Sequence, residues 1–148
     1  MKDEKVKEVN SLLFEFIPLY HQKFAVGFHQ DDNIRPRCNK SQIKAMFIIK
    51  KKEKILPTDL GKCMDMRKGS LTTLIDSLEG MNLVRRERDP HDRRKTWLSL
   101  TKEGMEYLDL KIQAYERNFM RLFEPIPEEE VDELVKSLKY VVDLIKRL

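Results

Sequence analysis

Helical periodicity extends along most of this chain, and one short segment with strand-like alternation interrupts it. In the run TWLSL at residues 96–100, Trp97 and Ser99 alternate with two leucines, and an apolar Leu-Val pair lies earlier at 83–84. Between these runs, residues 89–92 (Asp-Pro-His-Asp) supply turn-forming side chains. Because period-two alternation beside a turn indicates paired strands, the sequence predicts one β-hairpin set among helices.

Four helices are predicted before this hairpin. In the first, apolar residues recur at steps of three and four from Val6 to Phe28, which indicates a long amphipathic helix. Pro18 lies inside it, so we expect a kink there or two shorter helices. The second helix begins after Asn39, which can form a reciprocal cap with Gln42, and it is expected to end in the lysine run at 50–52.

The third and fourth helices are predicted to form a helix-turn-helix. A short strand at 55–56 (Ile-Leu) precedes Pro57, which suits the first position of a helix over residues 57–64. Residues 65–67 are short enough to be the turn. In the fourth helix, apolar residues recur from Leu71 to Leu78, and Asn82 is expected to end it in the left-handed conformation.

Two long helices are predicted after the hairpin. Thr101 can cap the first, whose apolar residues from Met105 to Leu122 step alternately by three and four, as in a coiled-coil seam. Three glutamates at 128–130 suit the positive dipole end of the second helix. The same stepping continues there from Val131 to Leu148.

Positive charge is concentrated in two segments that could meet phosphate. Residues 35–54 contain eight basic residues and one acid, and the hairpin has Arg93, Arg94 and Lys95 near its tip. The charged residues from 124 to 133 are all acidic. The net charge is only +4, so the distribution of charge, rather than its total, points to nucleic acid. By itself, the lysine run at 50–52 is interpreted as a solvated helix end.

A helix-turn-helix beside a basic hairpin is suited to reading DNA. One helix supports the next in the major groove, and the hairpin reaches an adjacent groove. The start of the fourth helix offers polar groups that suit phosphates and base edges, and Gly69 lets the backbone come close. The predicted contact residues of this segment are Arg67, Lys68, Ser70, Thr72 and Thr73.

Three stretches carry a family resemblance: LEGMNLVRR at 78–86, DPHDRR at 89–94 and LTKEG at 100–104. Together with the order of the flanking helices, they resemble the signature of the MarR family of winged-helix regulators along essentially the full length. Two positions depart from the family pattern. Arg67 stands where Ser or Thr is common, and Asn82 stands where Gly is usual.

The resemblance implies a mostly α (α+β) winged helix-turn-helix with long N- and C-terminal dimerisation helices. Its order is helix, helix, strand, helix, helix, strand, wing, strand, helix, helix. Residues 39–101 would form the DNA-binding lobe, and residues 1–34 and 102–148 the dimerisation lobe of a homodimer. Arg94 would insert into the minor groove with Asp92 orienting it. The implied function is a transcriptional regulator, expected to be a repressor, on a pseudo-palindromic double-stranded operator.

Members of the family commonly hold a small aromatic or lipophilic effector in a crevice between the two lobes. Four aromatic side chains could line such a crevice, although we interpret them first as core or dimer-interface residues. They are Tyr20, Phe24, Phe28 and Phe47.

The cysteines and histidines are interpreted without a catalytic or metal role. Cys38 is taken as an incidental thiol, with a redox sensor as the alternative because the flanking arginine could lower its pKa. Cys63 is expected in the core. The spacing of His21, His29 and Cys38 matches no standard metal site, so neither a metal nor a cofactor is expected.

Two other classes of protein were weighed. A small enzyme is disfavoured because the chain has neither a Gly-rich phosphate loop nor a nucleophile elbow. A winged-helix protein-interaction module is the alternative that remains, although such a module does not need a basic wing. With no disulfide framework, signal peptide or membrane span in its pattern, the chain is expected in the cytoplasm and away from membranes.

Overall fold

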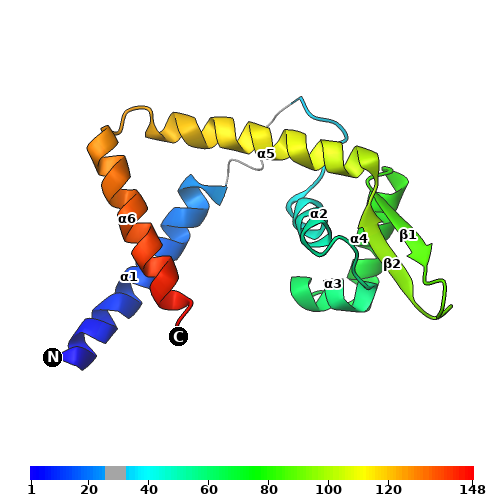
Figure 1. Ribbon diagram of the computed structural model, residues 1–148, viewed down its shortest axis with the longest axis horizontal. Helices are drawn as coiled ribbons and strands as arrows, with labels where there is room; N and C mark the ends of the chain where they lie inside the picture. Colours follow the sequence, from blue (N-terminus) through cyan, green and yellow to red (C-terminus); the bar gives the residue numbers. More distant parts are fainter. Residues whose placement is uncertain (26–32) are drawn as a thin grey trace.

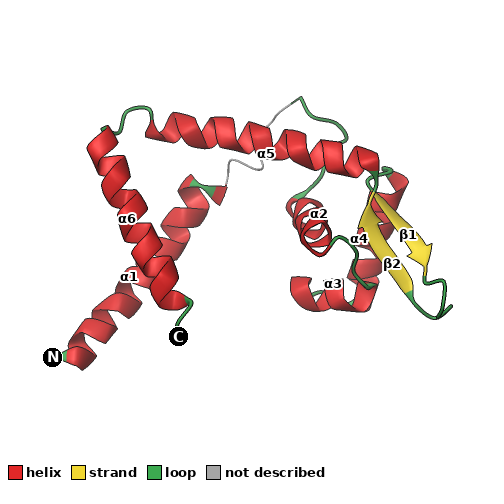
Figure 2. Ribbon diagram, viewed as in Figure 1, coloured by secondary structure: helices red, strands yellow, loops and turns green. Residues whose placement is uncertain are grey.

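The computed structural model describes residues 1–25 and 33–148, which form a mostly α winged-helix fold, as the sequence predicted (Figure 1, Figure 2). Figure 1 shows α5 running along the molecule, with the hairpin, α2, α3 and α4 near its N-terminal end and α6 after its C-terminal end. The elements are α1 (Lys2–Lys23), α2 (Lys40–Lys52), α3 (Pro57–Met64), α4 (Lys68–Gly80), β1 (Val84–Arg88), β2 (Thr96–Leu100), α5 (Lys102–Phe123) and α6 (Glu128–Ile145).

Two predicted helix caps are confirmed. At the start of α2, the Asn39 side chain accepts from the Gln42 backbone N–H at 2.9 Å, and the Gln42 side chain accepts from the Asn39 N–H at 2.8 Å. At the start of α5, Thr101 Oγ1 accepts from the Gly104 N–H at 2.9 Å. These bonds satisfy backbone donors that have no partner inside the helix, and so they fix where each helix begins.

The end of α4 also follows the prediction. Asn82 has φ of 58°, the left-handed conformation that Asn tolerates better than most residues. Its N–H donates to the Glu79 carbonyl at 2.9 Å, and the Leu83 N–H donates to the Leu78 carbonyl at 3.0 Å. Leu78 and Leu83 are both buried. This is a Schellman motif with its apolar contact, and it turns the chain directly into β1.

The sheet is an antiparallel pair in which Val84 faces Leu100 and Arg88 faces Thr96. The predicted short strand at 55–56 is reduced to a single bridge, in which Ile55 exchanges backbone hydrogen bonds with Leu98 at 3.0 and 2.8 Å. The pairing stops there because Leu56 is already the N-cap of α3 and the next residue, Pro57, has no N–H to donate.

Two details of the helices can be compared with expectation. Of the two outcomes expected at Pro18, the division into two shorter helices does not occur, since α1 is continuous from Lys2 to Lys23. The end of the expected stripe, at Phe28, lies outside the described residues. Residues 1–23 are exposed, so water can reach the carbonyl that Pro18 leaves without a helical donor. Cys63 was expected in the core and is exposed. Leu60 and Gly61 are the buried residues of α3, and Met64, one turn after Leu60, packs against the core instead.

The hydrophobic core lies within the winged unit, which is residues 39–101, and against the N-terminal half of α5 that packs on it. Its fully buried side chains come from α2, α3, α4, both strands and α5, and they hold these elements together. They include Met46, Ile49, Leu60, Leu78, Leu98 and Leu108. Neither α1 nor α6 contains a buried residue, although both are rich in apolar side chains. None of the described helices is long and apolar enough to cross a membrane.

Candidate nucleic-acid interface

One face of α4 is anchored in the core, and the opposite face is open to solvent. The anchoring residues are Leu71, Leu74, Ile75 and Leu78. The residues predicted to contact DNA, Lys68, Ser70, Thr72 and Thr73, are all exposed. Because residues three and four apart share a helix face, the spacing that buries the leucines also directs the polar residues outward.

The first turn of α4 is left open at its N-terminus. Arg67 is the N-cap residue, it is exposed, and its side chain makes no capping hydrogen bond. Backbone N–H groups there remain available to water or to an anion, together with the positive end of the helix dipole. Arg67 in place of Ser or Thr therefore exchanges a capping hydrogen bond for a positive charge at the same place.

The two threonines on α4 use their hydroxyl protons within the helix. Thr72 Oγ1 donates to the Lys68 carbonyl at 2.9 Å, and Thr73 Oγ1 donates to the Gly69 carbonyl at 3.1 Å. Each oxygen keeps lone pairs that can accept a hydrogen bond, and each side chain presents a methyl group. In this rotamer they suit a base-edge donor or a thymine methyl better than a phosphate oxygen.

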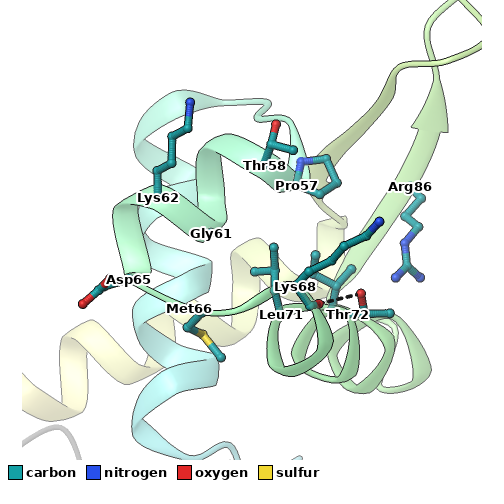
Figure 3. Close-up of a pocket in the computed structure, with 11 residues that line it drawn as sticks. Pro57, Thr58, Gly61, Lys62, Asp65, Met66, Lys68, Leu71, Thr72 and Arg86 are labelled. Atoms are coloured by element: carbon teal, nitrogen blue, oxygen red, sulfur yellow. Dashed lines mark hydrogen bonds between the residues drawn. The ribbon is translucent and has the colours of Figure 1, made fainter.

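A cleft of about 580 Å³ separates α3, α4 and β1 (Figure 3). Figure 3 shows Thr58 and Lys62 contributed by α3, Lys68 and Thr72 by α4, and Arg86 by β1. Arg86 contributed to the basic character of the hairpin in the sequence, but the structure directs its guanidinium to two carboxylates of α4. It is therefore paired with protein acids and is not presented at the wing tip.

The wing tip presents Arg94. The Asp92 carboxylate accepts from the Arg94 backbone N–H at 3.0 Å and from Arg94 Nε at 3.2 Å. The Arg94 side chain is 90% exposed, and that of Asp92 is 32% exposed. The hydrogen bond from the Arg94 side chain lowers the pKa of Asp92, and so keeps it ionised. Arg93 and Lys95, the other predicted wing contacts, are exposed beside it.

Asp89 and Trp97 are two further residues of the wing, and the sequence had indicated no role at the interface for either of them. The Asp89 carboxylate accepts from Trp97 Nε1 at 2.8 Å and from the backbone N–H groups of His91 and Asp92 at 2.8 and 3.0 Å. These bonds, the one from Trp97 most of all, lower the pKa of Asp89 from 3.8 to about 2. The Asp-Pro pair signalled a turn, but no pattern in the sequence signalled that Trp97 is its partner.

The structure brings together two of the four aromatic residues considered for an effector. The rings of Tyr20 and Phe24 lie 5.8 Å apart, and Phe24 lies 5.4 Å from Phe119 and 6.3 Å from Phe123 in stacked orientation. Phe47 is half-buried against the core of the winged unit, and Phe28 lies outside the described residues. The apolar stepping of α5 had indicated Phe119 as a seam residue, but not its contact with Phe24.

Cys38 lies in surroundings that disfavour its thiolate. The thiol is half-buried, and burial raises its pKa above the ordinary value, although Tyr107 and Lys111 act in the opposite direction. The flanking arginine was considered as a cause of a lowered pKa, and the direction found is the opposite. The redox-sensor alternative therefore loses its electrostatic support.

Known proteins with similar sequences are helix-turn-helix regulators. Residues 38–96 match the MarR family. The HTH-type transcriptional repressor YetL of Bacillus subtilis is 30% identical over 109 residues, which are 74% of this chain and 64% of that protein. The match spans between about half and two thirds of the length of YetL and of two other curated relatives, YkoM of Bacillus subtilis and SarZ of Staphylococcus haemolyticus.

Solved structures share the fold. A mutant MarR from E. coli superposes with a TM-score of 0.74 at 24% identity, over 88% of this chain and 96% of that one. The same mutant complexed with operator DNA superposes with a TM-score of 0.60, over 90% of this chain and 95% of that one. The names of these relatives describe transcriptional regulators. This agrees with the sequence, in which the lack of a Gly-rich phosphate loop and of a nucleophile elbow disfavoured an enzyme.

Proposed function

This chain belongs to the MarR family of winged-helix proteins, and we propose that it is a DNA-binding transcriptional regulator. The observation that carries the proposal is the Asp92–Arg94 pair. It holds a 90% exposed guanidinium at the tip of the hairpin, while α4 exposes Lys68 and Ser70. A cation on a narrow hairpin suits the minor groove, and a polar helix face suits the major groove.

We assign the winged unit, residues 39–101, to DNA binding. In this assignment Arg67 and Lys68 contact phosphates, whereas Ser70, Thr72 and Thr73 face base edges. Arg94 enters the minor groove, with Arg93 and Lys95 on the adjacent backbone. DNA as the partner would place the protein in the cytoplasm, as the sequence predicted.

We further propose that residues 1–34 and 102–148 form the interface of a homodimer. The support is the apolar surface that α1 and α6 leave exposed: Val6 is 57% exposed, Phe16 48% and Leu138 44%. Exposed apolar surface of this extent is unfavourable in a monomer. A dimer would present two α4 helices about one helical turn of DNA apart, roughly 34 Å, which matches a pseudo-palindromic operator. Repression follows if that operator overlaps a promoter.

The proposal also includes a small-molecule effector. The aromatic cluster of Tyr20, Phe24, Phe119 and Phe123 lies where the end of α1 meets α5. A small aromatic or lipophilic molecule that inserts there would alter the spacing of the two winged units and so favour a geometry unfit for the operator. A thermal-shift screen of such molecules tests it, and a screen without a stabilising compound would remove the effector from the proposal.

The regulator proposal is tested by fluorescence anisotropy with the intergenic DNA upstream of the protein's own gene, against shuffled DNA, at two salt concentrations. We expect selective, salt-dependent binding. Arg94→Ala should weaken it at least tenfold, about the effect of losing one good groove contact. Lys102→Ala is the matched control, because it removes one positive charge from an 85% exposed side chain at the base of the hairpin. Equal affinity for both DNAs would favour the protein-interaction module instead.

A further inference from the structure

The Asp89 side chain uses both oxygens to hold the wing turn. Oδ1 accepts from the backbone N–H groups of His91 at 2.8 Å and Asp92 at 3.0 Å, and Oδ2 accepts from the Trp97 indole at 2.8 Å. One carboxylate thus joins the turn backbone to the return strand. Hydrogen bonds to an ionised acceptor are stronger than those between neutral groups, so this is a firm connection for a short turn.

The turn that Asp89 holds is the one that orients Arg94. Asp92, whose N–H is bound by Asp89, accepts from both the backbone N–H and Nε of Arg94 at 3.0 and 3.2 Å. The Asp92 carbonyl also accepts from the Lys95 N–H at 3.0 Å, and the Asp89 N–H donates to the Lys95 carbonyl at 2.9 Å. The guanidinium is therefore connected to the strand through a continuous chain of hydrogen bonds.

Trp97 anchors this series of hydrogen bonds to the packed part of the fold. It lies in β2 opposite Glu87 and directly before Leu98, which is fully buried and bridged to Ile55. The ammonium group of Lys54 lies 4.7 Å from the centroid of its ring, so the indole is also held on the side of the α2–α3 connection. A side chain held by a packed strand can position a turn more precisely than the turn residues can by themselves.

We propose that Asp89 and Trp97 are positioning residues of the wing: the indole N–H fixes Asp89, Asp89 fixes the turn that carries Asp92, and Arg94 is thereby aimed before DNA arrives. This inference rests on the proposed function, since it explains how the wing arginine is presented to a groove. Pre-organisation of this kind lowers the entropy lost when a mobile arginine must be ordered on binding.

Charge alone makes the opposite prediction for Asp89. A carboxylate at the wing tip would repel phosphate, so its neutralisation should strengthen DNA binding. If Asp89 positions the wing, Asp89→Asn should instead weaken binding. Asn has a single acceptor oxygen, so it can accept from the indole N–H or from the turn amides, but not from both. Glu87→Gln is the matched control. It removes one carboxylate from the same hairpin, at a residue paired with Arg85 and outside the turn.

The first measurement is operator affinity for Trp97→Phe, Asp89→Asn, the double variant and Glu87→Gln. Trp97→Phe keeps a six-membered ring that can lie beside Lys54, and it removes the indole N–H donor together with the five-membered part of the ring. We expect each single variant in the Asp89–Trp97 pair to bind about three- to tenfold more weakly, the effect of one hydrogen bond. The double variant should be no weaker than the worse single variant, and Glu87→Gln should bind as well as wild type or better.

The same substitutions in an Arg94→Ala background separate positioning from general stability. If Trp97 acts through Arg94, then Trp97→Phe should have no further effect on affinity once Arg94 is removed. An equal loss in both backgrounds would overturn the proposal, as would tighter binding by Asp89→Asn.

The second measurement needs no DNA. Hydrogen exchange of the His91, Asp92 and Arg94 amides is followed by NMR in the free protein, and Trp97→Phe should accelerate exchange about three- to tenfold at these three sites, whereas Glu87→Gln should not. Unchanged exchange would overturn the inference whatever the DNA result. If exchange responds but wild type shows no preference for the operator, the wing turn is organised as described and it is the proposed function that fails.

Discussion

Arg86 of β1 donates to Asp76 of α4 at 2.6 Å, and its other terminal nitrogen donates to Glu79, one turn further along α4, at 2.8 Å. The Arg86 side chain is 28% exposed, whereas those of Asp76 and Glu79 are 60% and 45% exposed. One guanidinium thus fixes the hairpin to α4 at two points and offsets part of the negative charge of two carboxylates on the helix proposed to enter the major groove. Arg86 therefore sets both the position of α4 relative to the wing and the net charge on the exposed side of α4.

Arg86→Met should separate these two effects. We expect a small loss of stability, below about 1 kcal/mol, because the acidic partners are largely solvated. DNA affinity should fall about fivefold or more, because the two carboxylates would face the polyanion without the positive charge of Arg86 beside them. Adding Asp76→Asn and Glu79→Gln should recover most of the lost affinity. Thermal unfolding and anisotropy measure the two quantities, and a triple variant as weak as Arg86→Met would show that repulsion is not the cause.

Gly104 marks a close approach between α5 and the start of the hairpin. A Cβ at this position would clash with the Leu83 carbonyl oxygen, and this is backbone that cannot move aside as a flexible side chain can. Gly104→Ala should therefore lower the free energy of unfolding by about 1–3 kcal/mol or more, measured in urea. Gly80→Ala is the control, since nothing lies within 4 Å of its added Cβ and the helix gains propensity. Equal stability of the two variants would contradict this account.

The parts of the fold that depend on neighbouring residues could be predicted from the sequence. The Asn39–Gln42 capping box and the left-handed Asn82 each involve groups within five residues, so the pattern of side chains contains the whole interaction. The hairpin followed for the same reason, because its turn residues and its alternation are adjacent in the chain.

The parts that depend on distant partners could not be predicted. Arg86 looked like part of a basic wing, because the sequence does not show that it faces Asp76 and Glu79 on a helix ten and seven residues earlier. Trp97 looked like an ordinary strand residue, because its role depends on a carboxylate across the hairpin. Cys63 looked buried, because the 57–64 helix is too short for periodicity to identify its inner face.

The low pKa of Asp89 predicts how the wing responds to acid. Its folded-state pKa, about 2, lies below the ordinary value of 3.8, so its contribution to the wing is complete above pH 4 and is lost as pH falls toward 2. The chain has one tryptophan, so the indole N–H resonance reports the Asp89–Trp97 bond directly. Its chemical shift should change with a midpoint below pH 3, in wild type and in a His91→Ala variant that removes the neighbouring imidazole. A midpoint near pH 4 would show that the bond is weaker than described.

The proposed homodimer predicts which surface of α6 tolerates charge. Leu138 is 44% exposed in the isolated chain and lies on the same apolar stripe as Val141 and Ile145. Leu138→Lys should raise the dimer dissociation constant, because it would bury an unpaired charge in the interface, and monomer should appear in sedimentation velocity at micromolar protein. Operator affinity should then fall at least tenfold, because two linked winged units bind far more tightly than one. Lys139→Ala, at the adjacent residue, should leave both quantities unchanged. A monomeric wild type would contradict the proposed homodimer, and a Leu138→Lys variant that remains dimeric would place the interface elsewhere.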